Sequence, residues 1–169
     1  MIVYLCRHGI AVDLGFRGIR TDPDRCLSDD GQRKLHEAAK GYRKVIERPR
    51  RVITSPYLRA RQTALVLIEV FGLEATAEES PLLLPEADPS QALALVQGEL
   101  LQDAASSPIL LVGHEPHLGE LLALLLTGAE RAAIPLKKGM LVGVEIEDAR
   151  SMRGQLVLAL PQRAGRDLA

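Results

Sequence analysis

Two short apolar segments, each followed directly by a histidine, constrain the fold of this chain more than any other feature. Residues 1–5 are apolar and partly β-branched, and Arg7 and His8 come shortly after them. Residues 109–112 have the same character and are followed by a glycine and then by His114. Such runs, ending near glycine, are typical of buried strands. Because ligands of open α/β sheets bind at the carboxyl ends of the strands, both histidines are candidate active-site residues.

The remainder of the chain alternates between helix-like and strand-like patterns. Helices with one apolar face are expected over residues 28–46, 56–71, 90–100 and 115–127. Further strands are expected over residues 51–55, 73–76, 108–113, 140–146 and 155–160. This order predicts a single α/β domain over residues 1–169: a three-layer α/β/α sandwich around a mostly parallel sheet, with an antiparallel edge from the C-terminal strands. The last residues are expected to fray.

Composition limits the class of protein. The 169 residues are 47% apolar, enough for one core, and 21 basic residues nearly balance 22 acidic ones. We therefore expect neither a nucleic-acid surface nor a membrane span, since no apolar run is long enough to cross a bilayer. The chain begins directly with a strand, so no secretory signal is expected. Cys6 and Cys26 form no spacing motif, which favours reduced thiols in a cytoplasmic protein.

Residues 10–27 form a long segment without helical or strand periodicity. They contain glycines, a proline and many charged side chains, a composition atypical of a core element. A loop of this length in a compact domain is usually functional or disordered. Because it leaves directly from Arg7 and His8, we expect it to form a rim of the active site.

Arg59 and Arg61 lie in the first turns of a predicted helix, where a positive side chain is unfavourable for the helix dipole. An anion-binding site explains such placement, because free backbone N–H groups, the dipole and an arginine can converge on one anion. Taken singly, either arginine can also be explained as a solvated surface charge, which we expect of Arg61. His36 and His117 fall within predicted helices and are expected to be ordinary surface or packing residues.

Histidines and arginines without a metal or nucleotide motif favour phosphoryl chemistry. Neighbouring arginines would oppose a bound cation and no third ligand lies at metal spacing, so neither a metal nor a cofactor is expected. The glycine-rich signatures of nucleotide-binding folds and the nucleophile elbow of serine hydrolases are absent from the sequence. Guanidinium groups bind phosphoryl oxygens in pairs, and a neutral imidazole nitrogen can attack phosphorus.

Several segments, in this order, resemble the motifs of the histidine phosphatase superfamily, also called phosphoglycerate mutase-like. They are Leu5-Cys6-Arg7-His8-Gly9, residues 55–64 (SPYLRARQTA) and Val112-Gly113-His114-Glu115-Pro116. The pattern Arg25-x-Leu27-Ser28-x-x-Gly31 also resembles the turn that opens the first helix of the family. The short chain, residues 83–85 (LLP) and residues 137–139 (KKG) are most similar to SixA-type phosphohistidine phosphatases.

This resemblance implies a metal-independent phosphatase with a covalent mechanism. His8 would be the nucleophile that becomes transiently phosphorylated, and its pKa should be lowered because nearby arginines disfavour the protonated ring. The other catalytic residues would be Arg7, Arg59 and His114; these three, with Gly9 and Arg25, would bind the substrate.

The nature of the leaving group selects the substrate. Family members that hydrolyse phosphate esters usually take a carboxylic acid from the segment between the second motif and the second histidine. Here that segment is short, and Glu78, Glu79 and Glu86 lie in no recognisable acid motif. A phosphoramidate needs less help to leave, so we expect hydrolysis of the P–N bond of phosphohistidine in a protein, such as a histidine phosphotransfer domain.

Two alternatives stay open on the sequence alone. One is a phosphatase of a small phosphomonoester, with Glu79 or Glu86 as the acid. The other is a non-catalytic module that binds phosphate or a protein partner, although the intact His8 argues against it because binding alone needs only the arginines. No coiled-coil pattern is present, so a monomer is expected.

Overall fold

The computed structural model describes residues 1–102, 107–129 and 133–169. The described strands are β1 (Ile2–Arg7), β2 (Arg51–Thr54), β3 (Ala77–Glu79), β4 (Ile109–Gly113), β5 (Leu141–Ile146) and β6 (Gly154–Leu160). They form one six-stranded sheet in the order β3-β2-β4-β1-β5-β6. The first four run parallel, whereas β5 is antiparallel to β1 and β6 is antiparallel to β5. The expected mostly parallel sheet with an antiparallel C-terminal edge is confirmed.

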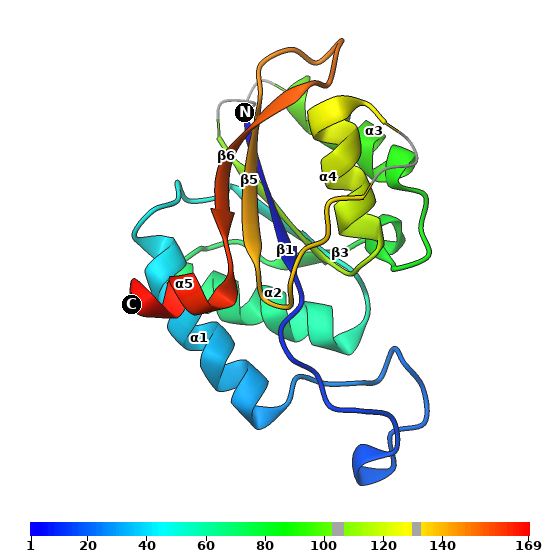
Figure 1. The fold of residues 1–169 in the computed structure, drawn as a ribbon, viewed down its shortest axis with the longest axis vertical. Helices are drawn as coiled ribbons and strands as arrows, with labels where there is room; N and C mark the ends of the chain where they lie inside the picture. Colours follow the sequence, from blue (N-terminus) through cyan, green and yellow to red (C-terminus); the bar gives the residue numbers. More distant parts are fainter. Residues whose placement is uncertain (103–106, 130–132) are drawn as a thin grey trace.

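Helices cover both faces of this sheet. The described α-helices are α1 (Asp29–Arg43), α2 (Leu58–Phe71), α3 (Pro89–Leu100), α4 (His117–Thr127) and α5 (Gln162–Asp167). Figure 1 shows α3 and α4 on one side of the sheet and α1, α2 and α5 on the other. Val3 and Leu5 of β1 pack toward α3 and α4, while Tyr4 and Cys6 pack toward α1 and α2. The three-layer α/β/α sandwich is confirmed.

The register of the central strands places the site. Arg7 at the end of β1 is paired with Gly113 of β4, and Thr54 at the end of β2 is paired with the residue just before Gly113. Three adjacent parallel strands therefore stop at the same level. The residues that follow them, His8, His114 and Ser55, leave the sheet at one edge, as expected for the two histidines.

Local signals account for the helix ends. Ser28 accepts a hydrogen bond from Gly31 N (3.0 Å) at the start of α1, as its predicted cap should. Gly72, with φ of 64°, ends α2 in the left-handed conformation. At α3 the cap is Asp88, whose side chain accepts from Ser90 N at 2.9 Å.

The prediction of a strand over residues 73–76 is wrong. Leu73 N donates to Ile68 O (3.1 Å), so this residue closes the end of α2 rather than starting a strand. The strand β3 begins later, at Ala77, which pairs with Val52 of β2.

The prediction that the C-terminus frays is also wrong, because α5 packs against α1. The two backbones approach so closely that a Cβ atom on Gly41 would lie 1.9 Å from Gly165 O. Lys44 Nζ also donates to the backbone oxygens of Leu168 and Ala169, at 2.7 Å each. Because neither glycine has a side chain, the two helices pack closely and the polar C-terminal segment is held against α1.

Three further observations concern the described residues as a whole. None of their helices is long and apolar enough to cross a membrane. Within the same residues, no three histidine, cysteine, aspartate or glutamate side chains gather as a metal site requires. Cys6 and Cys26 are both free thiols, and burial raises the pKa of Cys6 to about 12.

Candidate active site

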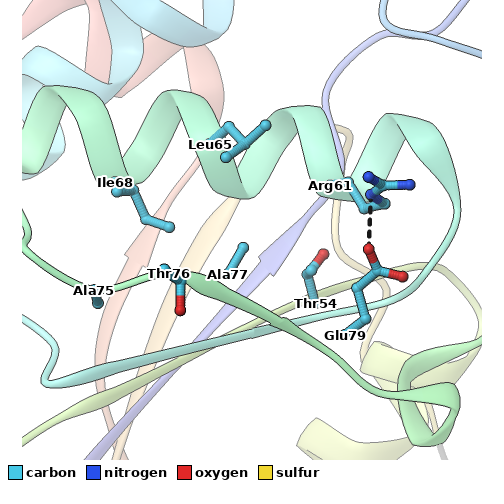
Figure 2. Close-up of a pocket in the computed structure, with 8 residues that line it drawn as sticks. All are labelled: Thr54, Arg61, Leu65, Ile68, Ala75, Thr76, Ala77 and Glu79. Atoms are coloured by element: carbon cyan, nitrogen blue, oxygen red, sulfur yellow. Dashed lines mark ion pairs between the residues drawn. The ribbon is translucent and has the colours of Figure 1, made fainter.

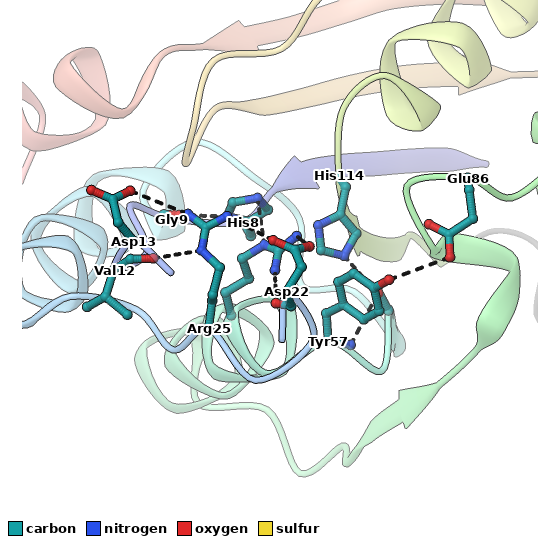
Figure 3. A network of polar contacts seen from close by, with 11 residues as sticks. His8, Gly9, Val12, Asp13, Asp22, Arg25, Tyr57, Glu86 and His114 are labelled. Atoms are coloured by element: carbon teal, nitrogen blue, oxygen red, sulfur yellow. Dashed lines mark hydrogen bonds and ion pairs between the residues drawn. The ribbon is translucent and has the colours of Figure 1, made fainter. Parts of the chain in front are cut away.

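The hydrogen bonds of His8 leave one of its ring nitrogens without a proton. The residue directly follows β1, and only 6% of it is exposed. Its Nδ1 lies 2.7 Å from Gly9 O, and because a carbonyl can only accept, Nδ1 carries the ring proton. Nε2 accepts a hydrogen bond of 3.2 Å from Nε of Arg59. The lone pair of the neutral imidazole is therefore on Nε2 and directed at the guanidinium of Arg59. Figure 3 shows His8 and His114 close to one another at this edge of the sheet.

The surroundings keep His8 neutral. Burial lowers its pKa to about 3, and the positive charges of Arg59, Arg7 and Lys138 act in the same direction. The hydrogen bond to Gly9 opposes this shift but does not offset it. The direction agrees with the sequence-based expectation, although burial rather than the arginines is the largest cause.

Arg59 lies in the first turn of α2 and is 5% exposed. Its guanidinium uses its other nitrogens on the loop that precedes α1: NH1 donates to Asp22 O (2.7 Å) and NH2 to Asp22 Oδ2 (2.8 Å). The same guanidinium lies over the ring of Tyr57, 5.0 Å from its centroid. The long loop of residues 10–27 thus contacts the site through Asp22, as expected for a rim.

His114 follows β4 and faces His8, with the ring centroids 5.0 Å apart. Its Nε2 shares a hydrogen bond of 2.8 Å with Oγ of Ser55, and its ring meets Tyr57 edge to face at 5.1 Å. Burial lowers the pKa of His114 to about 2, with His8 and Arg59 as further causes, so this ring is also neutral near pH 7. Its Nδ1 is buried and has no hydrogen-bond partner among the described residues.

Arg7 is the last residue of β1, and its NH1 donates to Leu136 O at 2.8 Å. Its Nε is buried without a partner in the described part of the protein, as is His114 Nδ1. The buried Nε–H of Arg7 is a donor that the protein does not satisfy, and it is suited to an anionic, oxygen-rich ligand. His114 Nδ1 is a second such donor in the tautomer in which Ser55 Oγ donates to His114 Nε2. The position of Leu136 is fixed in turn by Glu115, whose Oε1 accepts from Leu136 N (3.1 Å).

Gly9 and Arg25, the other two predicted substrate-binding residues, have protein partners here. Gly9 N donates to Oγ1 of Thr63 at 3.1 Å. Arg25 donates from NH1 to Asp22 Oδ1 (2.9 Å) and from Nε to Val12 O (2.7 Å). Both residues thus support the loop and helix around His8, and their contact with a substrate stays a prediction.

Sequence reasoning did not assign roles to Asp22, Ser55 or Thr63. Thr63 Oγ1 donates to Arg59 O (2.7 Å) as well as accepting from Gly9 N, so it connects both motifs. The helical spacing of Arg59 and Thr63 was a usable signal for their common face. Asp22 lies in an aperiodic loop, 37 positions from Arg59, and its role had no such signal.

The glutamates considered as acids are not bonded to the predicted catalytic side chains in the described structure. Glu78 pairs with Arg51, and Glu79 pairs with Arg61 (2.9 Å). That second ion pair lies at one end of a groove of about 310 Å³ between α2 and β3 (Figure 2). Glu86 is exposed and lies closer, with its Oε1 in a long 3.5 Å contact with the hydroxyl of Tyr57.

Arg61, His36 and His117 lie in the ordinary surface or packing positions that the sequence predicts. Arg61 has a side chain 49% exposed, consistent with a surface charge. His36 is half-buried on α1. His117 is fully buried in α4 and is a packing residue, with both ring nitrogens unpartnered among the residues described; burial lowers its pKa.

The family model of the histidine phosphatase superfamily (branch 1) matches residues 3–81. Phosphohistidine phosphatase SixA of Escherichia coli (strain K12) is 33% identical over 129 residues, which cover 76% of each chain. This chain belongs to the histidine phosphatase superfamily. An uncharacterized protein of Picosynechococcus sp. is 32% identical over 156 residues, covering 89% of this chain and 88% of that protein.

Solved structures of other phosphatases have a fold similar to that of this chain. The protein histidine phosphatase SixA complexed with tungstate superposes with a TM-score of 0.83 at 26% identity, covering 96% of this chain and 98% of that one. A mycobacterial glucosyl-3-phosphoglycerate phosphatase shares the fold, with a TM-score of 0.67 at 20% identity over 93% of this chain and 97% of that one. The chain is therefore a phosphatase, and the fold alone does not select its substrate.

Proposed function

We propose that this histidine phosphatase hydrolyses the P–N bond of phosphohistidine in another protein, through a phosphorylated His8. The observation that carries the substrate class is the state of Asp22, the carboxylate that binds Arg59 beside the proposed nucleophile. Burial alone would raise the pKa of Asp22, but hydrogen bonds from Arg25 and Arg59 lower it below its ordinary value. An anion held by two arginines is unsuited to protonating an alkoxide, whereas the imidazole of phosphohistidine needs less help to leave.

The proposed chemistry has two displacement steps. In the first, the Nε2 lone pair of His8 attacks phosphorus, the P–N bond of the substrate breaks, and its electron pair goes to the leaving imidazole, which takes a proton from solvent. In the second, water attacks the phosphorylated His8, the electron pair of that P–N bond returns to Nε2, and the water proton goes to phosphate or solvent. Metal ions take no part in this scheme.

Arg59, Arg7 and His114 would stabilise the transferring group. Arg59 Nε is 3.2 Å from the attacking nitrogen, so a phosphoryl group bound to Nε2 lies beside a guanidinium. The unpartnered Arg7 Nε–H is a further donor for its oxygens, and His114 Nδ1–H is another in the tautomer in which Ser55 Oγ donates to His114 Nε2. Fixed donors of this kind contribute roughly a hundredfold or more in rate each.

The proposed setting is a cytoplasmic protein that acts as a monomer on a phosphohistidine-bearing protein, such as a histidine phosphotransfer domain. The relatives named phosphohistidine phosphatase SixA support this substrate class. The two free thiols are compatible with a reducing compartment.

The test compares a histidine-phosphorylated phosphotransfer domain with an aryl phosphate, both in the presence of chelator. Faster turnover of the phosphoprotein, abolished in His8→Ala and retained in His36→Ala, is the expected result. Rapid quenching should also trap acid-labile phosphate on the parent protein but not on His8→Ala. Turnover that survives His8→Ala would exclude the covalent mechanism, and phosphate binding without turnover of either compound would favour the binding-module alternative.

A small phosphomonoester remains the second candidate because Glu86 contacts Tyr57, which in turn contacts His114. If Glu86 delivers a proton to an ester leaving group, Glu86→Gln lowers turnover of an alkyl phosphate and leaves that of phosphohistidine unchanged. Glu79→Gln is the matched control, since Glu79 pairs with Arg61 beside the groove of Figure 2. Equal ester turnover in both variants and the parent would exclude this candidate acid.

A further inference from the structure

Asp22 binds the guanidinium of Arg59 through both its backbone and its side chain. Its backbone oxygen accepts from Arg59 NH1 at 2.7 Å, and its Oδ2 accepts from NH2 at 2.8 Å. The Arg59 side chain is almost fully buried, whereas that of Asp22 is 42% exposed. One residue of the loop therefore binds both terminal nitrogens of a buried guanidinium.

We propose that Asp22 is a positioning residue, which holds the outer end of the Arg59 guanidinium so that its Nε–H is directed at Nε2 of His8. The inference rests on the proposed role of His8 as the nucleophile. A guanidinium is planar and carries five N–H donors in fixed directions. Fixing NH1 and NH2 on Asp22 therefore also fixes the direction of Nε–H, which is 3.2 Å from His8.

This arrangement leaves donors for a substrate. NH2 of Arg59 has two hydrogens, and Asp22 Oδ2 accepts one. Once the Nε2 lone pair of His8 bonds to phosphorus, it no longer accepts from Nε–H. Nε–H and the second NH2 hydrogen are then available to the oxygens of the phosphoryl group, while Asp22 remains in place. Asp22 and the phosphoryl group therefore bind different N–H donors of the same guanidinium and do not compete for them.

Two other contacts argue that Asp22 stays bound when a substrate enters. Its second carboxylate oxygen, Oδ1, accepts from Arg25 NH1 at 2.9 Å, and Arg25 is itself bound to Val12 O at 2.7 Å. The next residue, Pro23, accepts from Leu58 N at 3.0 Å at the start of α2. The carboxylate is thus attached to the loop on one side and the helix that carries Arg59 on the other.

The contacts also explain why Arg25 precedes the first helix in the pattern Arg25-x-Leu27-Ser28. Within the described residues, the Arg25 side chain bonds to Asp22, Val12 and, at 3.8 Å, Asp13, and not to His8. We assign Arg25 the role of holding Asp22, so that its effect on the reaction is indirect. Against the effect of burial, the hydrogen bonds from Arg25 and Arg59 lower the pKa of Asp22, so its carboxylate is anionic at neutral pH.

The experiment measures kcat and KM on a phosphohistidine protein for Asp22→Ala, Asp22→Asn and the control Asp24→Ala. Asp24 is an exposed carboxylate of the same loop whose described partner is Thr21 rather than an arginine. We expect kcat to fall about a hundredfold in Asp22→Ala, since a small misplacement of a catalytic group has that effect, with KM little changed. Asp22→Asn, which keeps an acceptor for Arg59, should recover most of kcat, and Asp24→Ala should match the parent.

A double-mutant cycle with Arg59→Ala separates positioning from a general effect on folding. If Asp22 acts through Arg59, then Asp22→Ala lowers kcat less than about twofold when Arg59 is already alanine. The same loss in both backgrounds would overturn the proposal. An Asp22→Ala variant with kcat equal to or above the parent would overturn it too, since the carboxylate would then be neutral or inhibitory.

The exchange of the Arg59 Nε–H proton with water can be measured without substrate, so it tests the role of Asp22 independently of the proposed function. In a spectrum of ¹⁵N-labelled protein, the Arg59 Nε–H signal should exchange slowly with water in the parent and in Asp24→Ala, and rapidly in Asp22→Ala. Slow exchange in Asp22→Ala would show that Arg59 keeps its place alone, and would overturn the positioning role. Failure of the parent to hydrolyse phosphohistidine would overturn the proposed function and leave this measurement interpretable.

Discussion

Ser55 Oγ and His114 Nε2 share a hydrogen bond of 2.8 Å at the ends of two neighbouring parallel strands. Ser55 Oγ also accepts from Tyr57 N at 3.3 Å, so the hydroxyl is held from a second side. Both Ser55 and His114 are buried, which makes the contact inaccessible to competing water. Ser55 therefore sets the orientation of the ring that faces His8.

Removal of this hydroxyl should slow turnover without unfolding the protein. We expect Ser55→Ala to lower kcat on phosphohistidine by about ten- to a hundredfold, because His114 loses its fixed orientation. Thermal unfolding should show that the variant remains folded at the assay temperature. Ser151→Ala, in an exposed turn, is the control. Equal kcat values for both variants and the parent would show that His114 does not depend on Ser55.

The charge states of His8 and His114 can be measured directly. An ordinary histidine gains a proton as the pH falls through about 6.5. With pKa values lowered to about 3 and about 2, His8 and His114 should stay neutral between pH 7.5 and 4.5. The ¹⁵N shifts of their rings should therefore be constant over this range, and those of His8 should show the proton on Nδ1. Titration of the His8 ring near pH 6.5 would contradict the buried, neutral state.

The same lowered pKa values predict that acid destabilises the fold. Between about pH 3 and 6.5 the unfolded chain binds a proton at His8 that the folded chain does not, so the contribution is complete above pH 6.5 and is lost as the pH falls. The free energy of unfolding should drop by about 1.4 kcal/mol per pH unit for each such histidine. Urea denaturation at pH 7 and 5 should show a smaller drop for His8→Ala than for His36→Ala. Identical drops would contradict this origin.

The sequence was sufficient for the central sheet and both histidines because their signals are local. A short apolar run that ends in glycine marks a strand wherever it lies, and parallel strands end at a common edge. Helix electrostatics pointed to both Arg59 and Arg61, and the resemblance to the family motif selected Arg59.

Contacts between distant segments were not predictable in this way. Asp22 lies in a loop with several charged residues and no periodic pattern. Only the structure shows that Asp22, and not Asp24, binds Arg59. The position of α5 depends on backbone contact between Gly41 and Gly165, two residues without side chains to form a pattern. The start of β3 was misplaced because Leu73 is apolar enough for a strand, while its backbone is committed to closing α2.

Gly139 gives a last prediction, in which two glycines respond in opposite directions to the same substitution. Its φ is 69°, its N–H is shared between the backbone oxygens of Arg7 and His8 (3.0 and 3.1 Å), and its carbonyl accepts from the hydroxyl of Tyr42 (2.7 Å). Gly139→Ala should cost about 1–2 kcal/mol of unfolding free energy, because a side chain is disfavoured in the left-handed region. The displaced turn should also lower kcat, since it contacts the backbone of the proposed nucleophile.

Gly98 is the matched control because it lies exposed in α3, where an added methyl group would meet only open space. Gly98→Ala should raise the unfolding free energy by roughly 0.5–1 kcal/mol, as alanine is favoured within helices, and leave kcat unchanged. Urea denaturation and turnover of phosphohistidine measure both effects. Equal stability of the two variants would mean that the backbone at Gly139 relaxes out of the left-handed conformation, and that the turn is not rigidly bound to the end of β1.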